Sequence, residues 1–411
     1  MNKADSERLE SALVQMGLSS VSSPDDADVI FLNSCVVRQS AEDKVVGTLG
    51  SLKPLKVNNP GKIVALMGCM VGPKTDVLEQ RFPYVDVFLR PQQYEPLINL
   101  IGERLGIDAE GCIGTLTASP NVTAYIPIIH GCDKFCTFCI IPYRRGREIS
   151  RPIPEIVREA ELLSHRGVKE VTLLGQNVDS YGHDLPGNPD LGDLLSEVNE
   201  ITSIQRVRFL TSHPNDMSDH IIDKVAELEK VCENINLPFQ AGDDQVLLDM
   251  RRGYTSDDYI RLVEKIRNRI PTVSMSTDLI VGFCGESDSQ FEKTLDMLRE
   301  IRFDKVHSAA YSTREGTIAD RKMKDDVSDE DKRYRLRAVD ELQEQIQTEL
   351  NSSYVDVETQ VLIEGMKRGR IYGRNRSDKL VYVDAPEDTI GSMVNVTIKE
   401  TSPWSLNGSL S

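Results

Sequence analysis

Three closely spaced cysteines are the residues of this chain with the clearest chemical potential. Cys132, Cys136 and Cys139 lie in the segment GCDKFCTFCIIPYRRG, residues 131–146, with the spacing Cys-x3-Cys-x2-Cys. Three thiolates this close together can bind three irons of a 4Fe-4S cube. The fourth iron then keeps an open coordination position, which makes a metal site reactive rather than structural. The trio therefore predicts a reactive iron–sulfur site.

Zinc is the alternative metal for such a group of cysteines. Structural zinc normally has four ligands, often from paired Cys-x2-Cys units, and no fourth ligand lies close by in the sequence. The spacing, with Phe138 before the last cysteine, instead resembles the radical S-adenosylmethionine (SAM) signature. That resemblance implies that the amino and carboxylate groups of SAM bind the open iron, and that an electron from the cluster splits SAM to a 5′-deoxyadenosyl radical.

The remaining five of the eight cysteines are scattered along the chain. Cys35 and Cys69 each end an apolar run, and parallel strands place their C-terminal ends at one edge of a sheet. Convergence of the two thiols favours a second metal site, whereas buried packing residues are the alternative. Cys112 falls in a Gly/Thr/Ser/Pro linker and is not expected to be a ligand. Cys232 and Cys284 are interpreted as packing residues.

The first hundred residues alternate between helical and strand-like segments. Apolar, strand-like runs lie at 27–35, 62–69 and 85–90, and helices are expected at about 3–17, 39–56 and 91–104. Continuous apolar strands between helices indicate a doubly wound parallel α/β domain covered on both faces. Such a domain normally opens with a strand, whereas here a helix comes first, so we expect the opening strand to be missing.

A second alternation begins at Ala124 and predicts a parallel (β/α)6 partial barrel. Strands are expected at about 124–131, 168–175, 205–212, 234–240, 274–282 and 305–311, with helices at about 153–166, 191–201, 217–229, 255–269 and 288–301 and a long charged helix at 327–350. Active sites of such barrels lie at the C-terminal ends of the strands. Ordinary loop residues are the alternative interpretation of the candidate SAM contacts there, which are Gly175, Gln176, Asn177, Ser212, Gln240 and Asp278, with His213 as a residue that caps a turn or acts in catalysis.

The last sixty residues consist of short β-like runs separated by Gly, Asn and Asp turns, which predicts a small OB-like β-barrel. Their segment 366–379, MKRGRIYGRNRSDK, is strongly basic and contains Tyr372. Such a patch suits the phosphates and stacked bases of a folded RNA, and a solvated hairpin is the alternative. The candidate RNA contacts are Lys367, Arg368, Arg370, Arg374 and Arg376, together with Lys379. The run Arg144, Arg145 and Arg147 suits either phosphate or salt bridges to barrel carboxylates.

Length and composition set limits on the class of protein. A chain of 411 residues suggests two or three domains, and 39% hydrophobic with 27% charged residues is ordinary for a globular protein. No apolar run approaches the roughly 18 residues of a membrane span, and no signal peptide is recognisable, so we expect a cytoplasmic protein. The net charge of −17 argues against a protein that coats nucleic acid, so RNA contacts must come from a local patch.

The order of several short motifs resembles the radical SAM methylthiotransferase family over nearly the whole chain. These motifs are SRP (150–152), LLGQNV (173–178), TSHP (211–214), LPFQAGDD (237–244), MRRGY (250–254) and TDLIVGF (277–283). MNKADSE at the start and LLGQNV are most similar to the MiaB-type branch of that family. The resemblance implies an N-terminal methylthiotransferase domain (1–106), a radical SAM core (118–348) and a TRAM RNA-binding domain (349–411).

The resemblance also implies a second, auxiliary 4Fe-4S cluster in the first domain. The family normally holds it with three cysteines, and Cys35 and Cys69 match the second and third of them. The first lies in a Gly-Cys-Gln-Met-Asn motif, and this sequence begins at the Met-Asn of that motif. We therefore expect a start codon assigned too far downstream and one missing ligand of the auxiliary cluster.

The implied reaction inserts a methylthio group at carbon 2 of isopentenyladenosine at tRNA position 37. One SAM methylates a sulfur at the auxiliary cluster, and a second gives the radical that removes hydrogen from carbon 2, which carries no acidic proton. The implied partners are tRNA, an electron donor such as flavodoxin or ferredoxin and a sulfur source, for a monomer without membrane contact. Alternatives are a related methylthiotransferase acting on a ribosomal protein or on threonylcarbamoyladenosine, or a non-catalytic RNA-binding protein with a structural metal.

Overall fold

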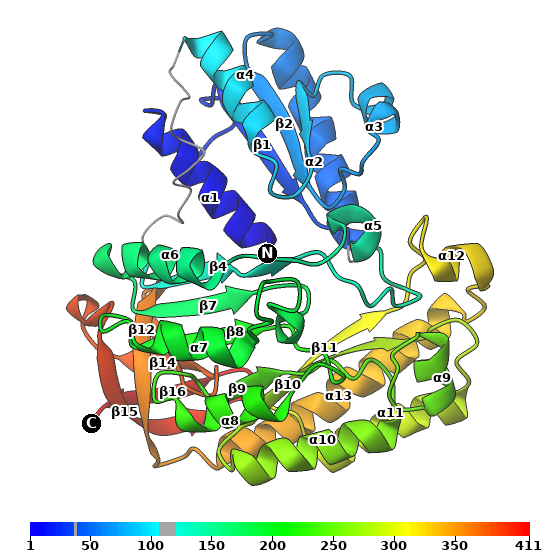
Figure 1. The fold of residues 1–411 in the computed structure, drawn as a ribbon, viewed down its shortest axis with the longest axis vertical. Helices are drawn as coiled ribbons and strands as arrows, with labels where there is room; N and C mark the ends of the chain where they lie inside the picture. Colours follow the sequence, from blue (N-terminus) through cyan, green and yellow to red (C-terminus); the bar gives the residue numbers. More distant parts are fainter. Residues whose placement is uncertain (37–38, 107–120) are drawn as a thin grey trace.

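The chain folds into three parts that follow one another along the sequence (Figure 1). This computed structural model describes residues 1–36, 39–106 and 121–411. The N-terminal α/β part lies above the central part in Figure 1, and the C-terminal strands pack against one side of the central part. Within the described residues, no helix combines the length and the apolar character that a membrane crossing requires.

The N-terminal part is the predicted doubly wound α/β unit. Its parallel sheet has the order β1-β2-β3. Successive side chains of a strand point to opposite faces. In β2, Ile63 and Met67 pack toward one apolar cluster, while Val64 and Leu66 pack toward the other. The elements are β1 (Val29–Ser34), β2 (Ile63–Gly68), β3 (Val87–Leu89), α1 (Asn2–Gln15), α2 (Gln39–Asn58), α3 (Asp76–Arg81) and α4 (Glu95–Leu105).

The central part contains the six parallel strands that the sequence pattern predicts. They are β4 (Thr123–Pro127), β7 (Glu170–Leu174), β8 (Arg206–Leu210), β9 (Asn234–Asn236), β10 (Ser274–Val281) and β11 (Lys305–Ala310). The first three pair in the order β4-β7-β8, and the other three in the order β9-β10-β11. A parallel bridge from Val207 to Val231, and a hydrogen bond of 3.0 Å from the Ser212 amide to the Asn236 carbonyl, join the two sheets.

Helices cover the outer face of these strands and share one large apolar core with them. They are α6 (Ile153–His165), α7 (Leu191–Asn199), α8 (Asp219–Glu227), α10 (Ser256–Arg269), α11 (Asp288–Ile301) and α13 (Asp329–Ser352). Asp190, Ser218, Thr255 and Ser287 cap four of these helices with their side chains, which fixes where each helix begins after its loop. Shorter elements lie near the loops: β5 (Ile129–His130), α5 (Ile141–Arg145), β6 (Ile149–Ser150), η1 (Val178–Ser180), α9 (Asp244–Asp249) and α12 (Ile318–Lys322).

The C-terminal part is a closed barrel with the strand order β12-β13-β14-β16-β15. Alternate side chains of its strands, such as Val361, Ile363 and Val396, fill a separate apolar core. The elements are β12 (Glu358–Lys367), β13 (Arg370–Asn375), β14 (Leu380–Asp384), η2 (Glu387–Thr389), β15 (Met393–Thr401) and β16 (Leu406–Leu410). The predicted small β-barrel is therefore confirmed.

This barrel docks on the amino-terminal ends of the central strands. Arg206 opens β8 with a fully buried side chain, and its guanidinium donates to the carbonyls of Arg374 at 2.6 Å and Gln360 at 2.9 Å. Arg208, two residues on, donates to the carbonyls of Asn375 and Arg376 at 2.6 and 2.8 Å. Charged donors on buried carbonyls make strong hydrogen bonds, so this interface holds the C-terminal barrel at the end of the central barrel opposite the C-terminal ends of its strands.

Candidate active site

The three predicted cluster cysteines lie on a loop that begins after β5 and closes on itself. The amide of Cys132 donates to the carbonyl of Gly146 at 3.2 Å, so the two ends of the loop meet. Gly131 has a φ of +77°, and a Cβ there would lie 2.0 Å from the carbonyl oxygen of Arg147. Glycine alone permits this approach with this backbone conformation. The tight base of the loop therefore keeps all three thiols on one short segment.

The middle of the loop is fixed by Thr137, which is 3% exposed. Its amide donates to the carbonyl of Met250 at 3.1 Å, and its hydroxyl donates to the carbonyl of Asp249 at 2.8 Å. Its own carbonyl accepts from the amide of Ala319 at 2.8 Å. The end of α9 and the start of α12 thus hold the loop from two sides, which positions Cys136 and Cys139 on either side of Thr137.

The thiols have an environment that suits a metal–thiolate cluster. Burial raises the pKa of Cys132 and of Cys139 to about 12 each. A bound metal replaces the thiol protons and removes this penalty. The third thiol, Cys136, accepts a hydrogen bond of 3.3 Å from the guanidinium of Arg252, so a buried cation lies against the sulfur. Three thiol donors and a nearby positive charge fit an anionic iron–sulfur group.

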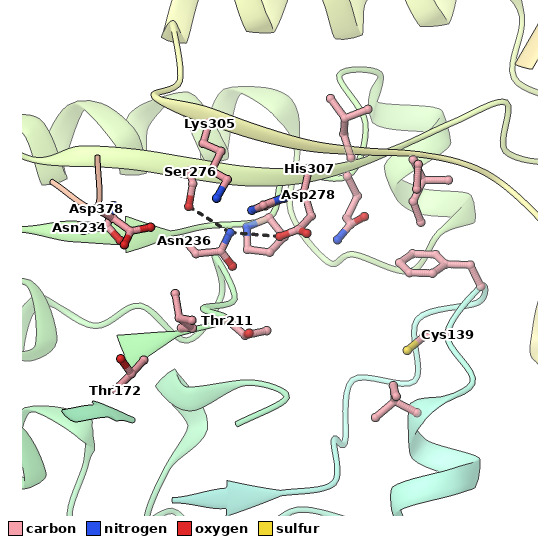
Figure 2. Close-up of a pocket in the computed structure, with 18 of the residues that line it drawn as sticks. Cys139, Thr172, Thr211, Asn234, Asn236, Ser276, Asp278, Lys305, His307 and Asp378 are labelled. Carbon is pink, nitrogen blue, oxygen red and sulfur yellow. Dashed lines mark hydrogen bonds between the residues drawn. The ribbon is translucent and has the colours of Figure 1, made fainter. Parts of the chain in front are cut away.

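A cavity of about 770 Å³ lies inside the partial barrel beside this loop. Cys139 lies at one end of the cavity and Asp378, from the C-terminal part, at the other (Figure 2). This volume is typical of small-molecule sites. Apolar lining residues include Val36, Phe138, Ile140, Ile141, Leu279, Ile280 and Tyr311, and polar lining residues include Thr172, Thr211, Asn234, Asn236, Ser276, Asp278, Lys305 and His307.

Two of the six predicted SAM contacts, Gln240 and Asp278, line this cavity. Gln240 has a φ of +71°, and its backbone amide donates to the backbone carbonyl of Asp278 at 3.0 Å. The Asp278 carboxylate accepts from the amide nitrogen of Asn236 at 3.1 Å, as Figure 2 shows. The other four, Gly175, Gln176, Asn177 and Ser212, follow β7 and β8 and are not part of the cavity lining.

Buried polar atoms at these strand ends favour a bound ligand. Among the described residues, Gln176 Oε1, Asn177 Oδ1 and His213 Nε2 are buried without a hydrogen-bond partner. Asn177 uses its amide nitrogen on Asp216 at 2.6 Å, and the Ser212 hydroxyl donates to Asp179 at 2.9 Å. Buried polar groups normally have partners, so these two oxygens and the ring nitrogen are free to bind a further group.

His213 has the turn-capping contact that was one of its two predicted roles. Its Nδ1 accepts from the Asn215 amide at 3.3 Å, which assigns the ring proton to Nε2. Burial, with Arg252 and Lys134 nearby, lowers the pKa of His213 to about 2, so the ring is neutral. The buried Nε2–H is therefore a neutral donor that has no partner among the described residues, rather than a source of positive charge.

Cys35 and Cys69 lie at the same edge of the N-terminal sheet. Strands β1 and β2 are parallel neighbours with Ser34 opposite Gly68, so the next residue of each strand is a cysteine at the C-terminal edge. Burial raises the pKa of Cys69, and the adjacent Arg145 opposes that rise. Cys112, the linker cysteine, lies outside the described residues.

Arg145 connects this edge to the cluster loop, because it ends α5, which follows Cys139 directly. Its guanidinium donates to Asn2 at 2.7 Å and pairs with Asp5 at 3.2 Å. Arg147, predicted with it as a candidate for phosphate contact, is exposed and pairs with Asp133 at 2.7 Å. Both arginines therefore form salt bridges, Arg147 within the central part and Arg145 with the N-terminal part rather than with a barrel carboxylate.

The two cysteine sites approach the same cavity. Val36, the neighbour of Cys35, lines the cavity together with Cys139. Ile140 and Ile141 from the cluster loop pack with Val36 in an apolar cluster of the N-terminal part. The N-terminal part thus contributes a lining residue, Val36, to the cavity that Cys139 also lines.

The structure separates the predicted RNA contacts into two groups. Lys367, Arg368 and Arg370 are exposed around the turn between β12 and β13. Arg374 instead pairs with Glu364 and Asp378 at 3.4 Å each, and Arg376 pairs with Glu233 at 2.8 Å across the docking interface. The sixth basic residue of the segment, Lys379, is buried and pairs with Asp304 at 2.7 Å. The first group remains available to a partner.

Sequence reasoning did not identify Arg252, which lies in the MRRGY motif next to an exposed arginine. Nothing in the local pattern distinguishes the buried arginine from its neighbour Arg251. It also did not identify Arg206 and Arg208 as docking residues. A signal for them was available in the sequence: in the predicted buried strand, two arginines alternate with apolar residues. Buried arginines normally need partners from another part of the chain.

The partial parallel barrel with a reactive three-cysteine loop after its first strand defines a radical SAM protein. The sequence model described as the Radical SAM superfamily matches residues 126–298. Models of Uncharacterized protein family UPF0004 and of the TRAM domain match residues 1–90 and 353–411. SAM and iron–sulfur clusters of the 4Fe-4S type are the cofactors that follow from the radical SAM match and from the full-length relatives described next.

Full-length relatives narrow the family further. A tRNA-2-methylthio-N(6)-dimethylallyladenosine synthase of Herpetosiphon aurantiacus is 46% identical, over 100% of this chain and 95% of the relative. Proteins of the same name from Dehalococcoides mccartyi and Acetivibrio thermocellus are 44% and 40% identical, over 100% of this chain and 96% and 88% of those relatives. The chain therefore belongs to this family of radical SAM methylthiotransferases, which confirms the resemblance stated above.

Solved structures support the fold. The radical SAM methyltransferase TsrM of Kitasatospora setae has a TM-score of 0.53 at 14% identity, covering 73% of this chain and 66% of that chain. The cobalamin-dependent radical SAM enzyme OxsB has a TM-score of 0.51 at 12% identity, covering 82% and 53%. At these identities the likeness shows a shared architecture only.

Proposed function

We propose that this protein is a tRNA methylthiotransferase that inserts a methylthio group at carbon 2 of isopentenyladenosine at tRNA position 37. The observation that carries this proposal is one cavity whose lining includes both Cys139 and Val36, the neighbour of Cys35. A reaction that needs both a radical and a sulfur donor requires two reactive sites that face one substrate. The names of the full-length relatives give the same activity.

In this proposal, different groups of residues bind the two clusters and position the substrate. Cys132, Cys136 and Cys139 would hold the first cluster, and Cys35 and Cys69 would be ligands of the auxiliary cluster. With SAM bound, the first cluster would supply the radical chemistry that removes the hydrogen from carbon 2. The chain itself positions the substrate, excludes water from the buried cavity and holds both sites rigid through Thr137 and Arg145.

The lining of the cavity suits an adenine that carries an apolar chain. Phe138, Ile140 and Ile141 flank Cys139 with apolar surface that matches an isopentenyl group. Asn236, Asp278 and other polar residues supply the donors and acceptors that a purine and a ribose require. Burying an apolar chain of this size is favourable by about 0.8 kcal/mol for each CH2 group, so adenosine without the chain is expected to bind more weakly.

The tRNA body is expected to contact the exposed turn of the C-terminal barrel. Lys367, Arg368 and Arg370 supply positive charge in a chain whose net charge is −17, and Arg370 lies 4.1 Å from the ring centroid of Tyr382. Arginine over an aromatic ring provides both charge and a flat stacking surface. The further partners proposed are an electron donor such as flavodoxin or ferredoxin and a sulfur source, for a monomer in the cytoplasm.

The test is an anaerobic reaction of the iron- and sulfide-reconstituted protein with SAM, reductant and tRNA bearing isopentenyladenosine, followed by mass spectrometry of the nucleosides. We expect a methylthio adduct on that nucleoside. Cys139→Ala should abolish it, whereas Cys232→Ala, a buried cysteine outside the cavity lining, should leave it unchanged. A product on a ribosomal protein but not on tRNA would contradict the proposal.

A further inference from the structure

Arg252 places a buried guanidinium directly against a cluster cysteine. Its side chain is 5% exposed and has three partners. Nη1 donates to Cys136 Sγ at 3.3 Å, Nη2 donates to the Pro238 carbonyl at 3.1 Å, and Nε donates to the Tyr254 hydroxyl at 2.9 Å. Each of the three guanidinium nitrogens therefore has its own hydrogen-bond partner, and together the three partners fix the orientation of the guanidinium.

The backbone around Arg252 holds that geometry rigidly. The Arg252 amide donates to the Leu247 carbonyl at 2.9 Å, and its carbonyl accepts from the Asn215 side chain at 3.1 Å. Gly253 follows with a φ of +74°, and a Cβ there would lie 2.9 Å from the Asn215 side chain. Asp249 and Met250, just before Arg252, bind Thr137 of the cluster loop. The guanidinium and Cys136 consequently move as one unit.

Within the described residues, the charge of Arg252 has no carboxylate partner. Its contacts are a sulfur, a carbonyl and a hydroxyl, whereas the buried Arg335 and Arg145 pair with acids and the buried Arg206 binds two carbonyls. A buried unpaired cation costs several kcal/mol. The one group beside it that becomes anionic is the metal–thiolate site of Cys136, so the structure places the counter-charge of Arg252 on that site.

We propose that Arg252 is a positioning residue that raises the reduction potential of the cluster held by Cys132, Cys136 and Cys139. The inference rests on the proposed function only through the presence of that cluster. Reduction adds one electron from the external donor to the cluster, with no bond made or broken and no proton taken up, because arginine stays charged. The added negative charge is stabilised by a fixed cation and an N–H···S hydrogen bond, two of the features that set such potentials.

The test compares midpoint potentials of the reconstituted full-length protein by redox titration monitored by electron paramagnetic resonance, with the SAM-sensitive signal assigned to this cluster. Arg252→Gln removes the charge. Arg252→Lys keeps the charge but replaces the planar guanidinium, with its several N–H donors, by a single ammonium group. Arg251→Gln is the matched control, because it removes the same charge from the adjacent exposed position. Iron is counted in every sample, and SAM binding is measured by equilibrium dialysis.

We expect Arg252→Gln to retain its iron while the equilibrium constant for reduction falls about tenfold, which equals about 59 mV for one electron. Arg252→Lys should show a smaller fall, and Arg251→Gln none. A loaded glutamine variant with the wild-type potential would overturn the inference. If that variant does not load iron, an unchanged potential in the loaded lysine variant overturns it equally. Failure of the wild-type protein to bind iron would instead count against the proposed function.

Discussion

Replacing Thr137 by valine is expected to loosen the cluster loop without altering its cysteines. The hydroxyl of this buried side chain donates to the Asp249 carbonyl at 2.8 Å, whereas its backbone hydrogen bonds to Met250 and Ala319 do not depend on the hydroxyl. Valine has nearly the same shape, so the substitution leaves no large cavity. What it removes is one hydrogen bond between the loop and the end of α9.

The magnitude follows from the burial of that hydrogen bond. A neutral hydrogen bond contributes about 0.5–1.5 kcal/mol, and leaving the Asp249 carbonyl without its donor raises the cost to about 1–3 kcal/mol. Each 1.4 kcal/mol is roughly a tenfold change in an equilibrium constant. Local opening of the loop should therefore become about fivefold to about a hundredfold more frequent. Loss of metal to a chelator tracks that opening when the loop recloses quickly.

The assay follows the visible absorbance of the reconstituted cluster in excess chelator under anaerobic conditions. The cluster absorbance of Thr137→Val should decay about ten times faster than that of the wild-type protein. Thr277→Val is the matched control, because Thr277 is fully buried and its hydroxyl donates to the Leu237 carbonyl at 2.9 Å, in β10 rather than on the loop. An unchanged rate in Thr137→Val, or an equal acceleration in Thr277→Val, would refute the reasoning.

Three further outcomes are expected. Burial raises the folded-state pKa of Asp179 from 3.8 to about 7, so its contribution to stability is present at low pH and is lost as the pH rises through about 7. The melting temperature of the wild-type protein should therefore fall as the pH rises toward about 7. Asp179→Asn should remove the part of that fall that is due to Asp179. The double variant Lys367→Glu and Arg368→Glu should weaken tRNA binding in a filter assay. The slope of log affinity against log salt concentration should become shallower by the amount that corresponds to roughly two lost phosphate contacts. Gly131→Ala should reduce the iron content measured after reconstitution, because its Cβ would overlap the Arg147 carbonyl.

Each of these outcomes has a control or a contradicting result. The double variant Arg261→Glu and Lys265→Glu makes the same charge change on the exposed face of α10 and should leave tRNA binding nearly intact. Equal weakening by both pairs would indicate a long-range charge effect instead of a contact. An Asp179→Asn variant whose melting temperature keeps the wild-type pH dependence would contradict the burial argument, and full iron content in Gly131→Ala would contradict the role given to the loop base.

Local sequence patterns predicted the strands and the covered sheets because burial on both faces imposes long apolar runs. β2, with all six residues buried, and the run from Glu170 to Leu174 are examples. The same patterns predicted the cluster loop, because metal ligation by one short segment is encoded in its spacing. They also predicted that Cys35 and Cys69 end neighbouring strands, since parallel order follows from alternating helices.

Contacts between distant segments could not be predicted in the same way. Arg374 and Arg376 form part of a basic segment that suits RNA, and the structure pairs both with acids of the same chain. That pairing depends on where the C-terminal barrel docks, which is determined by Arg206 and Arg208 more than a hundred and fifty residues earlier. Similarly, the role of Arg252 depends on a sulfur 116 positions away in the sequence.

The central claim is that this cavity exposes carbon 2 of the modified adenine to a SAM-derived radical. The most direct measurement uses tRNA with deuterium at carbon 2 of its isopentenyladenosine and analyses the 5′-deoxyadenosine formed by the reconstituted protein. The account predicts one deuterium in 5′-deoxyadenosine, together with the methylthio nucleoside. Formation of 5′-deoxyadenosine without deuterium, or its complete absence from protein that carries iron and binds SAM, would contradict it.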